Sequence, residues 1–172
     1  MARTYYIDGY NVIHHSSALR KVIRHDLERA RELLIDRVAQ LCITMGTETY
    51  LVFDGRGRSR ADKIPHHRHV DHLHVVYTPL EKTADAWIER EVYKHHDRMA
   101  VCVVTNDRGI RDLCRGMGAL TMDAENFLTT VRESHRDVDE VVQRKAQVES
   151  HFVEDRLSGD SLEALRRLRE KL

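Results

Sequence analysis

The segment TYYIDGYN, residues 4–11, is the clearest indication of the fold, because it places an apolar run directly before an aspartate and two turn-forming residues. Short apolar runs rich in β-branched and aromatic residues are typical of strands. Four later segments share the pattern, so we expect five strands: residues 4–8, 49–54, 72–78, 101–107 and 119–123. An aspartate at a strand end often caps a helix or forms a turn, so Asp8 alone does not establish a functional site.

Helical periodicity alternates with these strands. Apolar residues recur three and four positions apart within residues 27–41, 84–92 and 127–142. Strands buried on both faces and separated by helices form parallel sheets. The sequence therefore predicts an α/β fold, a three-layer sandwich with a mainly parallel central sheet of about five strands. Beyond about residue 136 the pattern is highly charged and helical, so we expect a domain at residues 1–135 and a C-terminal helical extension at residues 136–172.

Composition excludes several classes of protein. The 28 Lys and Arg residues balance 28 Asp and Glu residues, so any surface for nucleic acid is local. Cys42, Cys102 and Cys114 form no CxxC pair, which argues against structural zinc and favours buried thiols in a reducing cytosol. No apolar run approaches the ~20 residues of a membrane span, and the N-terminus lacks the core of a signal peptide. We expect a cytoplasmic protein without membrane association.

Acidic residues follow the predicted strands in register. The aspartates concerned are Asp8, Asp54, Asp107 and Asp123. Carboxyl ends of parallel strands line the edge of the sheet where ligands bind, so these side chains should converge.

A further group of acids lies within TPLEKTADAWIER, residues 78–90, where a helix is expected to begin at Thr78 or at Thr83. From either start, Glu81, Asp85 and Glu89 are expected on one helix face, where like charges repel one another.

Clustered carboxylates call for a cation. Two carboxylates about 4 Å apart repel by ~4 kcal/mol at an effective dielectric constant near 20. Oxygen ligands without thiolates select Mg²⁺ or Mn²⁺, which also bind phosphates. Hydrolysis of phosphodiester bonds is the chemistry that such ions support.

The segments YIDGYNVI, VFDG, TADAWIE and VVTND, in this order, resemble the NYN domain of the YacP-like family, within the PIN-like nuclease group. The resemblance covers about residues 4–132 and implies a metal-dependent endoribonuclease of the bacterial cytoplasm, using Mg²⁺ or Mn²⁺. It implies catalytic roles for Asp8, Asn11, Asp85 and Asp107 and metal ligation by Asp8, Asp54, Asp85 and Asp107. Supporting roles fall to Glu81, Glu89, Thr105 and Asn106, although Lys82 stands where family members often carry an acid. Similar members act on translated messenger RNA at the ribosome, which leaves the ribosome open as a partner.

A local basic stretch, residues 55–72, leaves the same edge of the predicted sheet and is expected to bind the RNA backbone. Its cations are Arg56, Arg58, Arg60, Lys63 and Arg68. The alternative is a solvated loop without a role in binding.

The sequence excludes some other functions, because their motifs are missing, and leaves several alternatives open. GRGRSR, residues 55–60, has no third glycine of a dinucleotide fingerprint, and no phosphate-binding P-loop occurs, so no nucleotide cofactor is expected. A non-catalytic RNA-binding adaptor and a metal-dependent phosphatase are the open alternatives for the whole protein. The histidines His66, His67, His69, His72 and His74 permit a transition-metal site as a minor alternative. The sequence leaves the oligomeric state undetermined.

Overall fold

The computed structural model describes residues 4–55 and 70–134. The chain divides into two units, Met1–His135 and Arg136–Leu172, and the described helices and strands all belong to the first. The predicted RNA-binding cations Arg56, Arg58, Arg60, Lys63 and Arg68, and the predicted C-terminal extension, lie outside the described residues.

The described elements alternate between strands and helices. In chain order they are β1 (Thr4–Asp8), α1 (Gly9–His15), α2 (Ser17–Ile23), α3 (Leu27–Met45), β2 (Glu48–Phe53), β3 (Leu73–Tyr77), α4 (Ala84–Lys94), the 3-10 turn η2 (Arg98–Ala100), β4 (Val101–Val104), α5 (Arg108–Gly116) and β5 (Leu120–Met122). Residues 124–134 form a further helical stretch.

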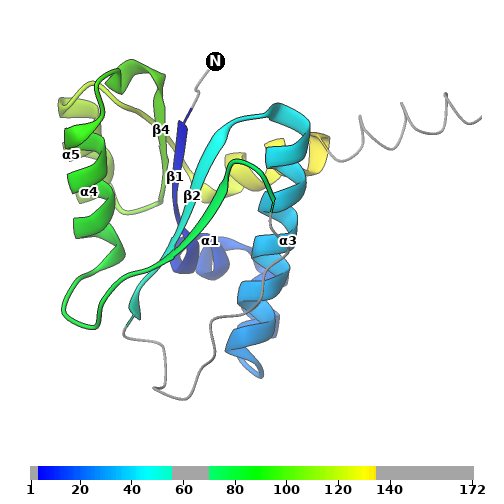
Figure 1. Cartoon of the computed structure of the whole chain (residues 1–172). Coiled ribbons are helices and arrows are strands. Elements are labelled where there is room, and N and C mark those ends of the chain that lie inside the picture. The colour runs from blue at the N-terminus through cyan, green and yellow to red at the C-terminus, as the bar shows by residue number, and fades with distance from the viewer. Residues whose placement is uncertain (1–3, 56–69, 135–172) are drawn as a thin grey trace, which may run out of the picture. The chain divides into compact units, whose positions relative to one another are not determined.

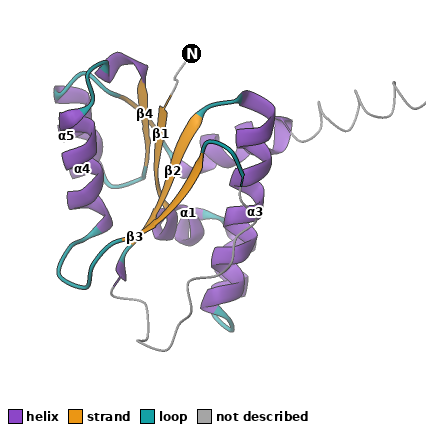
Figure 2. Ribbon diagram, in the orientation of Figure 1, coloured by secondary structure: helices purple, strands orange, loops and turns teal. Residues whose placement is uncertain are grey.

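The five strands form one parallel sheet in the order β3-β2-β1-β4-β5, with β1 in the middle (Figure 2). In this register Tyr6 lies opposite Tyr50 of β2 and opposite Val103 of β4. The arrangement confirms the predicted α/β sandwich with a parallel central sheet.

Alternation along the strands gives the sheet two apolar faces. Ile7 and Phe53 belong to the core shared with α1, α2, α3 and residues 124–134. Tyr6 and Val52 belong to the core shared with α4 and α5. Figure 1 shows α4 and α5 on one side of the sheet and α1 and α3 on the other. Side chains two residues apart on a strand share a face, which produces the three layers.

Several boundaries differ from the sequence prediction. β4 ends at Val104, whereas the strand was expected to reach Asp107, because Thr105 to Asp107 form the turn that starts α5. The helices α1, α2 and α5 were not predicted, since they are short and bury few residues. They begin at side-chain caps, such as Ser16 Oγ accepting from Leu19 N at 3.2 Å at the start of α2.

The start of α4 corrects one prediction. The helix begins after the cap residue Thr83, whose Oγ1 accepts from Ala86 N at 3.2 Å. Glu81 therefore precedes the helix and is exposed, so of the three expected acids only Asp85 and Glu89 share a helix face. Thr78, the other candidate cap, instead bonds the loop after β2.

Two predictions from composition can be compared with the fold. Cys42, Cys102 and Cys114 are buried and free, which confirms that they are buried thiols. Within residues 4–55 and 70–134, no helix is long and apolar enough to cross a membrane.

Candidate functional site

The chain changes direction across the sheet at β1. It proceeds from β1 outward to β2 and β3 and then returns to β4 on the other side of β1. Loops diverge at such a point and leave a crevice at the carboxyl ends of the strands. A cavity of about 430 Å³ opens at this place, and Asp8, Asp54 and Asp85 all line it. Three of the four predicted metal ligands therefore share one cavity.

Asp8 has two tasks at the end of β1. Its Oδ1 accepts from Asn11 N at 3.0 Å and caps α1, so the interpretation of this acid as a helix cap is correct. Capping alone would lower the pKa of Asp8, yet its pKa is raised. Burial, together with the negative charges of Asp85, Asp107 and Asp54, raises the pKa of Asp8 to about 6 despite the bond from Asn11 N.

Asp85 lies in the first turn of α4 and has no such bond. Its Oδ1 is buried and accepts no hydrogen bond from the described residues. Burial and the charges of Asp107 and Asp54 raise its pKa. A buried carboxylate oxygen without a donor is unfavourable in the protein alone, and this oxygen fits a ligand that supplies a proton or a positive charge.

The turn that carries Asp54 is fixed by a contact between loops. Gly55 N donates to Thr78 Oγ1 at 3.0 Å, and Thr78 Oγ1 donates to Lys82 O at 2.6 Å. A Cβ at Gly55 would lie 1.9 Å from the Thr78 carbonyl oxygen, so only glycine permits this approach. The loops after β2 and β3 are thus held together beside the cavity.

Asn11 joins loops that are distant in sequence. Its Oδ1 accepts from Asn106 N at 2.8 Å, and Asn106 Oδ1 accepts from Ala124 N at 2.8 Å. Thr105 is buried, and its Oγ1 accepts from Asp107 N at 3.2 Å. The oxygens of Asn11 and Asn106 therefore hold the loops after β1, β4 and β5 together, while that of Thr105 stabilises the turn after β4. Asn11 lines the cavity, and its side-chain nitrogen donates to no other described residue.

The other predicted acids lie farther out. Asp107 is exposed and caps α5 by accepting a hydrogen bond from Ile110 N at 3.1 Å. It does not line the cavity, but its negative charge raises the pKa of Asp8 and of Asp85. Asp123 caps the helical stretch 124–134 through Asn126 N at 2.8 Å. Glu81 and Glu89 are exposed and do not line the cavity.

The cavity residues fit a hard divalent cation in charge and in donor type. Asp8, Asp54 and Asp85 offer only oxygen ligands, and one oxygen of Asp85 is buried without a donor. Across the described ranges, no three His, Cys, Asp or Glu side chains are gathered into a metal-binding group. Mg²⁺ does not require one, because it keeps several waters and binds through one or two carboxylates plus substrate phosphates.

Five residues of the cavity were not among the predicted site residues: Tyr10, His14, His15, Thr83 and Ala84. The two histidines are exposed and are the last two residues of α1. Helical spacing in the sequence could have identified the two histidines, because His14 and His15 lie one helical turn after Tyr10 and Asn11 on α1.

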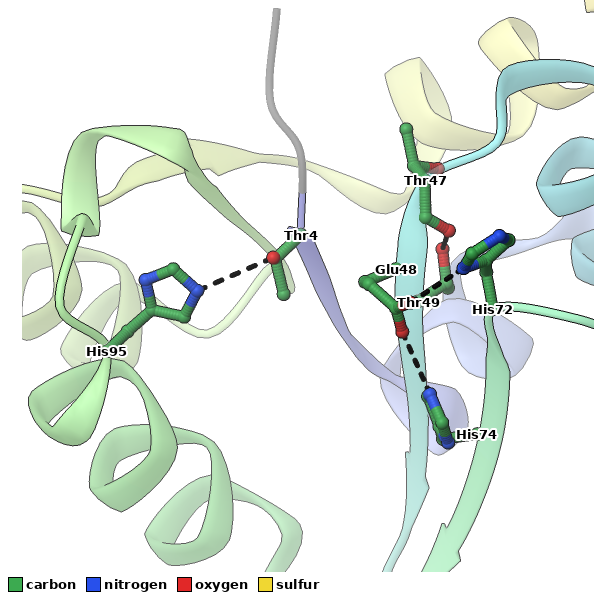
Figure 3. A network of polar contacts seen from close by, with 7 residues as sticks. All are labelled: Thr4, Thr47, Glu48, Thr49, His72, His74 and His95. Carbon is green, nitrogen blue, oxygen red and sulfur yellow. Dashed lines mark hydrogen bonds and ion pairs between the residues drawn. The ribbon is translucent and has the colours of Figure 1, made fainter.

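The histidines considered for a transition metal lie elsewhere. His72 Nδ1 lies 2.6 Å from Glu48 Oε1, and His74 Nε2 lies 2.9 Å from Glu48 Oε2 (Figure 3). Glu48 is the first residue of β2, so this trio is at the amino ends of the strands, away from the acidic cavity. His66, His67 and His69 are outside the described residues.

Comparisons with known proteins agree with this fold. The profile of the YacP-like NYN domain matches residues 5–170, which confirms the resemblance seen in the motifs. The uncharacterized protein YacP of Bacillus subtilis strain 168 is 27% identical over 140 residues, which is 80% of each chain. The crystal structure of Rae1 (YacP) from Bacillus subtilis superposes with a TM-score of 0.70 at 25% identity, covering 99% of this chain and 95% of that one. A mutant of the same protein gives a TM-score of 0.69 at 25% identity, with coverage of 83% and 82%.

Proposed function

Because the chain belongs to the YacP-like NYN family, whose domain is of the PIN-like nuclease type, we propose that it is a metal-dependent endoribonuclease that hydrolyses RNA phosphodiester bonds. One observation carries the proposal. Asp8 at the end of β1, Asp54 just after β2 and Asp85 in the first turn of α4 line one cavity, and their mutual repulsion raises the pKa of Asp8 beyond the effect of burial. A protein retains such repulsion where function requires it.

The proposed site assigns a task to each residue. Asp8 and Asp85 would hold a Mg²⁺ or Mn²⁺ ion, with Asp54 beside them and Asp107 adding negative charge. The bound ion would supply an activated water and neutralise charge on the phosphate. Asn11 keeps the loops after β1 and β4 in place through Asn106 N, and its side-chain nitrogen is available to donate to a phosphate oxygen.

A cleavage assay tests the reaction. Purified protein is incubated with structured RNA, single-stranded RNA, DNA and a chromogenic phosphoester, with and without Mn²⁺. We expect metal-dependent cleavage of RNA and its loss in Asp8→Asn and in Asp85→Asn. The matched control is Asp26→Asn, which exchanges an exposed helix cap at the start of α3 and should cleave normally. Undiminished cleavage by the Asp8→Asn protein would contradict the assignment.

Metal binding has a separate readout that does not depend on catalysis. Mg²⁺ or Mn²⁺ should raise the thermal unfolding midpoint of the wild type, because a ligand that binds only the folded state stabilises it. The same ions should have a smaller effect on Asp85→Asn. Stoichiometric, tightly bound zinc would contradict the proposed donor set.

The assay also separates the alternatives from the sequence. Binding of RNA without cleavage under any metal would favour a non-catalytic adaptor, and cleavage of the phosphoester alone would favour a phosphatase. We extend the proposal to translated messenger RNA at the ribosome because similar family members act there. Cleavage of one messenger RNA in a reconstituted translation reaction, compared with the same RNA without ribosomes, tests this extension.

A further inference from the structure

A second cavity lies next to the acidic one. Its volume is about 300 Å³, at the lower end of the range found for ligand sites. It lies among the junction of α1 and α2, the middle of α3 and residues 124–134, on the sheet face opposite α4. His15 lines both cavities, so the two adjoin at this side chain.

The second cavity is lined by cations that lack acidic partners. Arg37 and Arg132 both line it, and neither forms an ion pair with a carboxylate among the described residues. Arg132 Nη2 donates to Thr129 Oγ1 at 2.9 Å, which leaves its other donors available. Glu125 is the acid at the rim, and it pairs with neither arginine. Two arginines without an acidic partner beside one cavity favour a bound anion.

The orientation of His15 is set by a backbone contact. Its Nδ1 lies 2.8 Å from Asn11 O, and a carbonyl only accepts, so Nδ1 carries the proton. The ring is thereby held on α1 as the side chain that both cavities share.

We propose that the second cavity binds a backbone phosphate of the same RNA strand whose scissile bond lies at the acidic cavity, with Arg37 and Arg132 as its ligands. The inference rests on the proposed function for the identity of the strand. Planar guanidinium groups match phosphate oxygens in pairs, and the shared His15 gives the strand a path between the two cavities. The acidic cavity repels RNA in the absence of metal, and the two arginines offset that repulsion at a neighbouring nucleotide.

RNA binding without cleavage tests the proposal. The dissociation constant of a fluorescent single-stranded RNA is measured by anisotropy with EDTA present, over a range of salt concentrations. The double variant Arg37→Gln with Arg132→Gln should weaken binding roughly tenfold at low salt. It should also reduce the slope of log affinity against log salt concentration by about 0.7 for each phosphate that the variant no longer neutralises. The corresponding double exchange to Lys keeps the charges and should retain most of the wild-type slope.

The control is Arg115→Gln, an exposed arginine of α5 that lines neither cavity and should bind as the wild type does. Thermal unfolding of each variant shows that loss of binding is not loss of folding. With metal, the Gln double variant should show a raised KM and an unchanged kcat.

The outcomes distinguish this inference from the proposed function. Wild-type affinity and salt slope in the folded Gln double variant would overturn the phosphate site, even if cleavage is normal. Weakened binding in that variant, combined with a wild type that never cleaves RNA, would support the phosphate site and overturn the nuclease. Equal weakening by Arg115→Gln would also overturn the inference, because the effect would then be one of total charge.

Discussion

Exchanging Asp8 for asparagine should stabilise the metal-free protein while abolishing cleavage. Asparagine caps helices as well as aspartate does, so the bond from Asn11 N to the side chain at position 8 is preserved. What disappears is a buried negative charge close to the charges of Asp85, Asp107 and Asp54. The variant therefore removes the unfavourable charge at position 8 while it keeps the helix cap, so a change in stability reports the charge alone.

The size of the effect follows from the pKa. Burial and the neighbouring carboxylates raise the pKa of Asp8 from its usual 3.8 to about 6. One pKa unit corresponds to about 1.4 kcal/mol, so ionised Asp8 destabilises the fold by roughly 3 kcal/mol at pH 7. The asparagine amide in the variant is also buried and retains part of the desolvation cost, so we expect the free energy of unfolding to rise by about 1–3 kcal/mol. For a domain of this size each kcal/mol raises the unfolding midpoint by roughly 3–6 °C.

The sign of the pH dependence provides a second check. A carboxyl group whose pKa is higher in the folded state binds its proton more tightly there, so its contribution to stability falls as pH rises from 3.8 to about 6. The advantage of Asp8→Asn over wild type should therefore be complete above pH 6 and absent below pH 3.8.

Urea unfolding with EDTA at several pH values measures this difference, with Asp26→Asn as the control cap exchange. A gain of equal size at neutral and acid pH would rule out this explanation, because only ionisation of Asp8 predicts a dependence. No gain at pH 7 would show that the carboxylates do not repel one another at this position.

Three further outcomes test the fold around the site. Gly55→Ala should disrupt the loop beside the cavity and reduce cleavage, because its Cβ would lie 1.9 Å from Thr78 O; normal kinetics would contradict that close approach. Phe127→Ala should lower the free energy of unfolding by about 3–5 kcal/mol in denaturant titrations, since the ring is fully buried in the core. Glu48→Gln should lower thermal stability most between about pH 4.5 and 6.5. Bonding between Glu48 and His72 lowers the pKa of Glu48 and raises the pKa of His72, so their attraction is lost when low pH protonates Glu48 or high pH deprotonates His72. A loss of stability that does not depend on pH would contradict this explanation.

Local sequence patterns were sufficient to locate the elements that bury apolar side chains. The apolar run at residues 4–8 indicated a strand, and the three- and four-residue spacing within residues 27–41 indicated a helix. Such patterns are informative because side-chain direction repeats with the period of the backbone. The same periodicity missed α5, in which Cys114 is the single buried residue. A helix that buries so little leaves hardly any apolar pattern to read.

The sequence also indicated where acids would gather, since Asp8 and Asp54 stand at the ends of strands and parallel strands share their carboxyl edge. It overestimated what each acid does there. Asp107 and Asp123 were expected beside Asp8 as members of one group; both cap helices and neither lines the cavity, although the charge of Asp107 acts on Asp8 and Asp85. Local sequence shows which residues follow a strand, and it contains nothing about which of them turn into the cavity.

The geometry of the site, in contrast, depends on tertiary packing. The bond from Asn106 N to Asn11 Oδ1 joins residues 95 positions apart, and it exists only because β4 pairs with β1. The buried oxygen of Asp85 and the shared position of His15 depend in the same way on how α4, α1 and residues 124–134 pack on the sheet. Strand order and layer packing are set by the summed free energy of many distant contacts, which no single stretch of the chain carries.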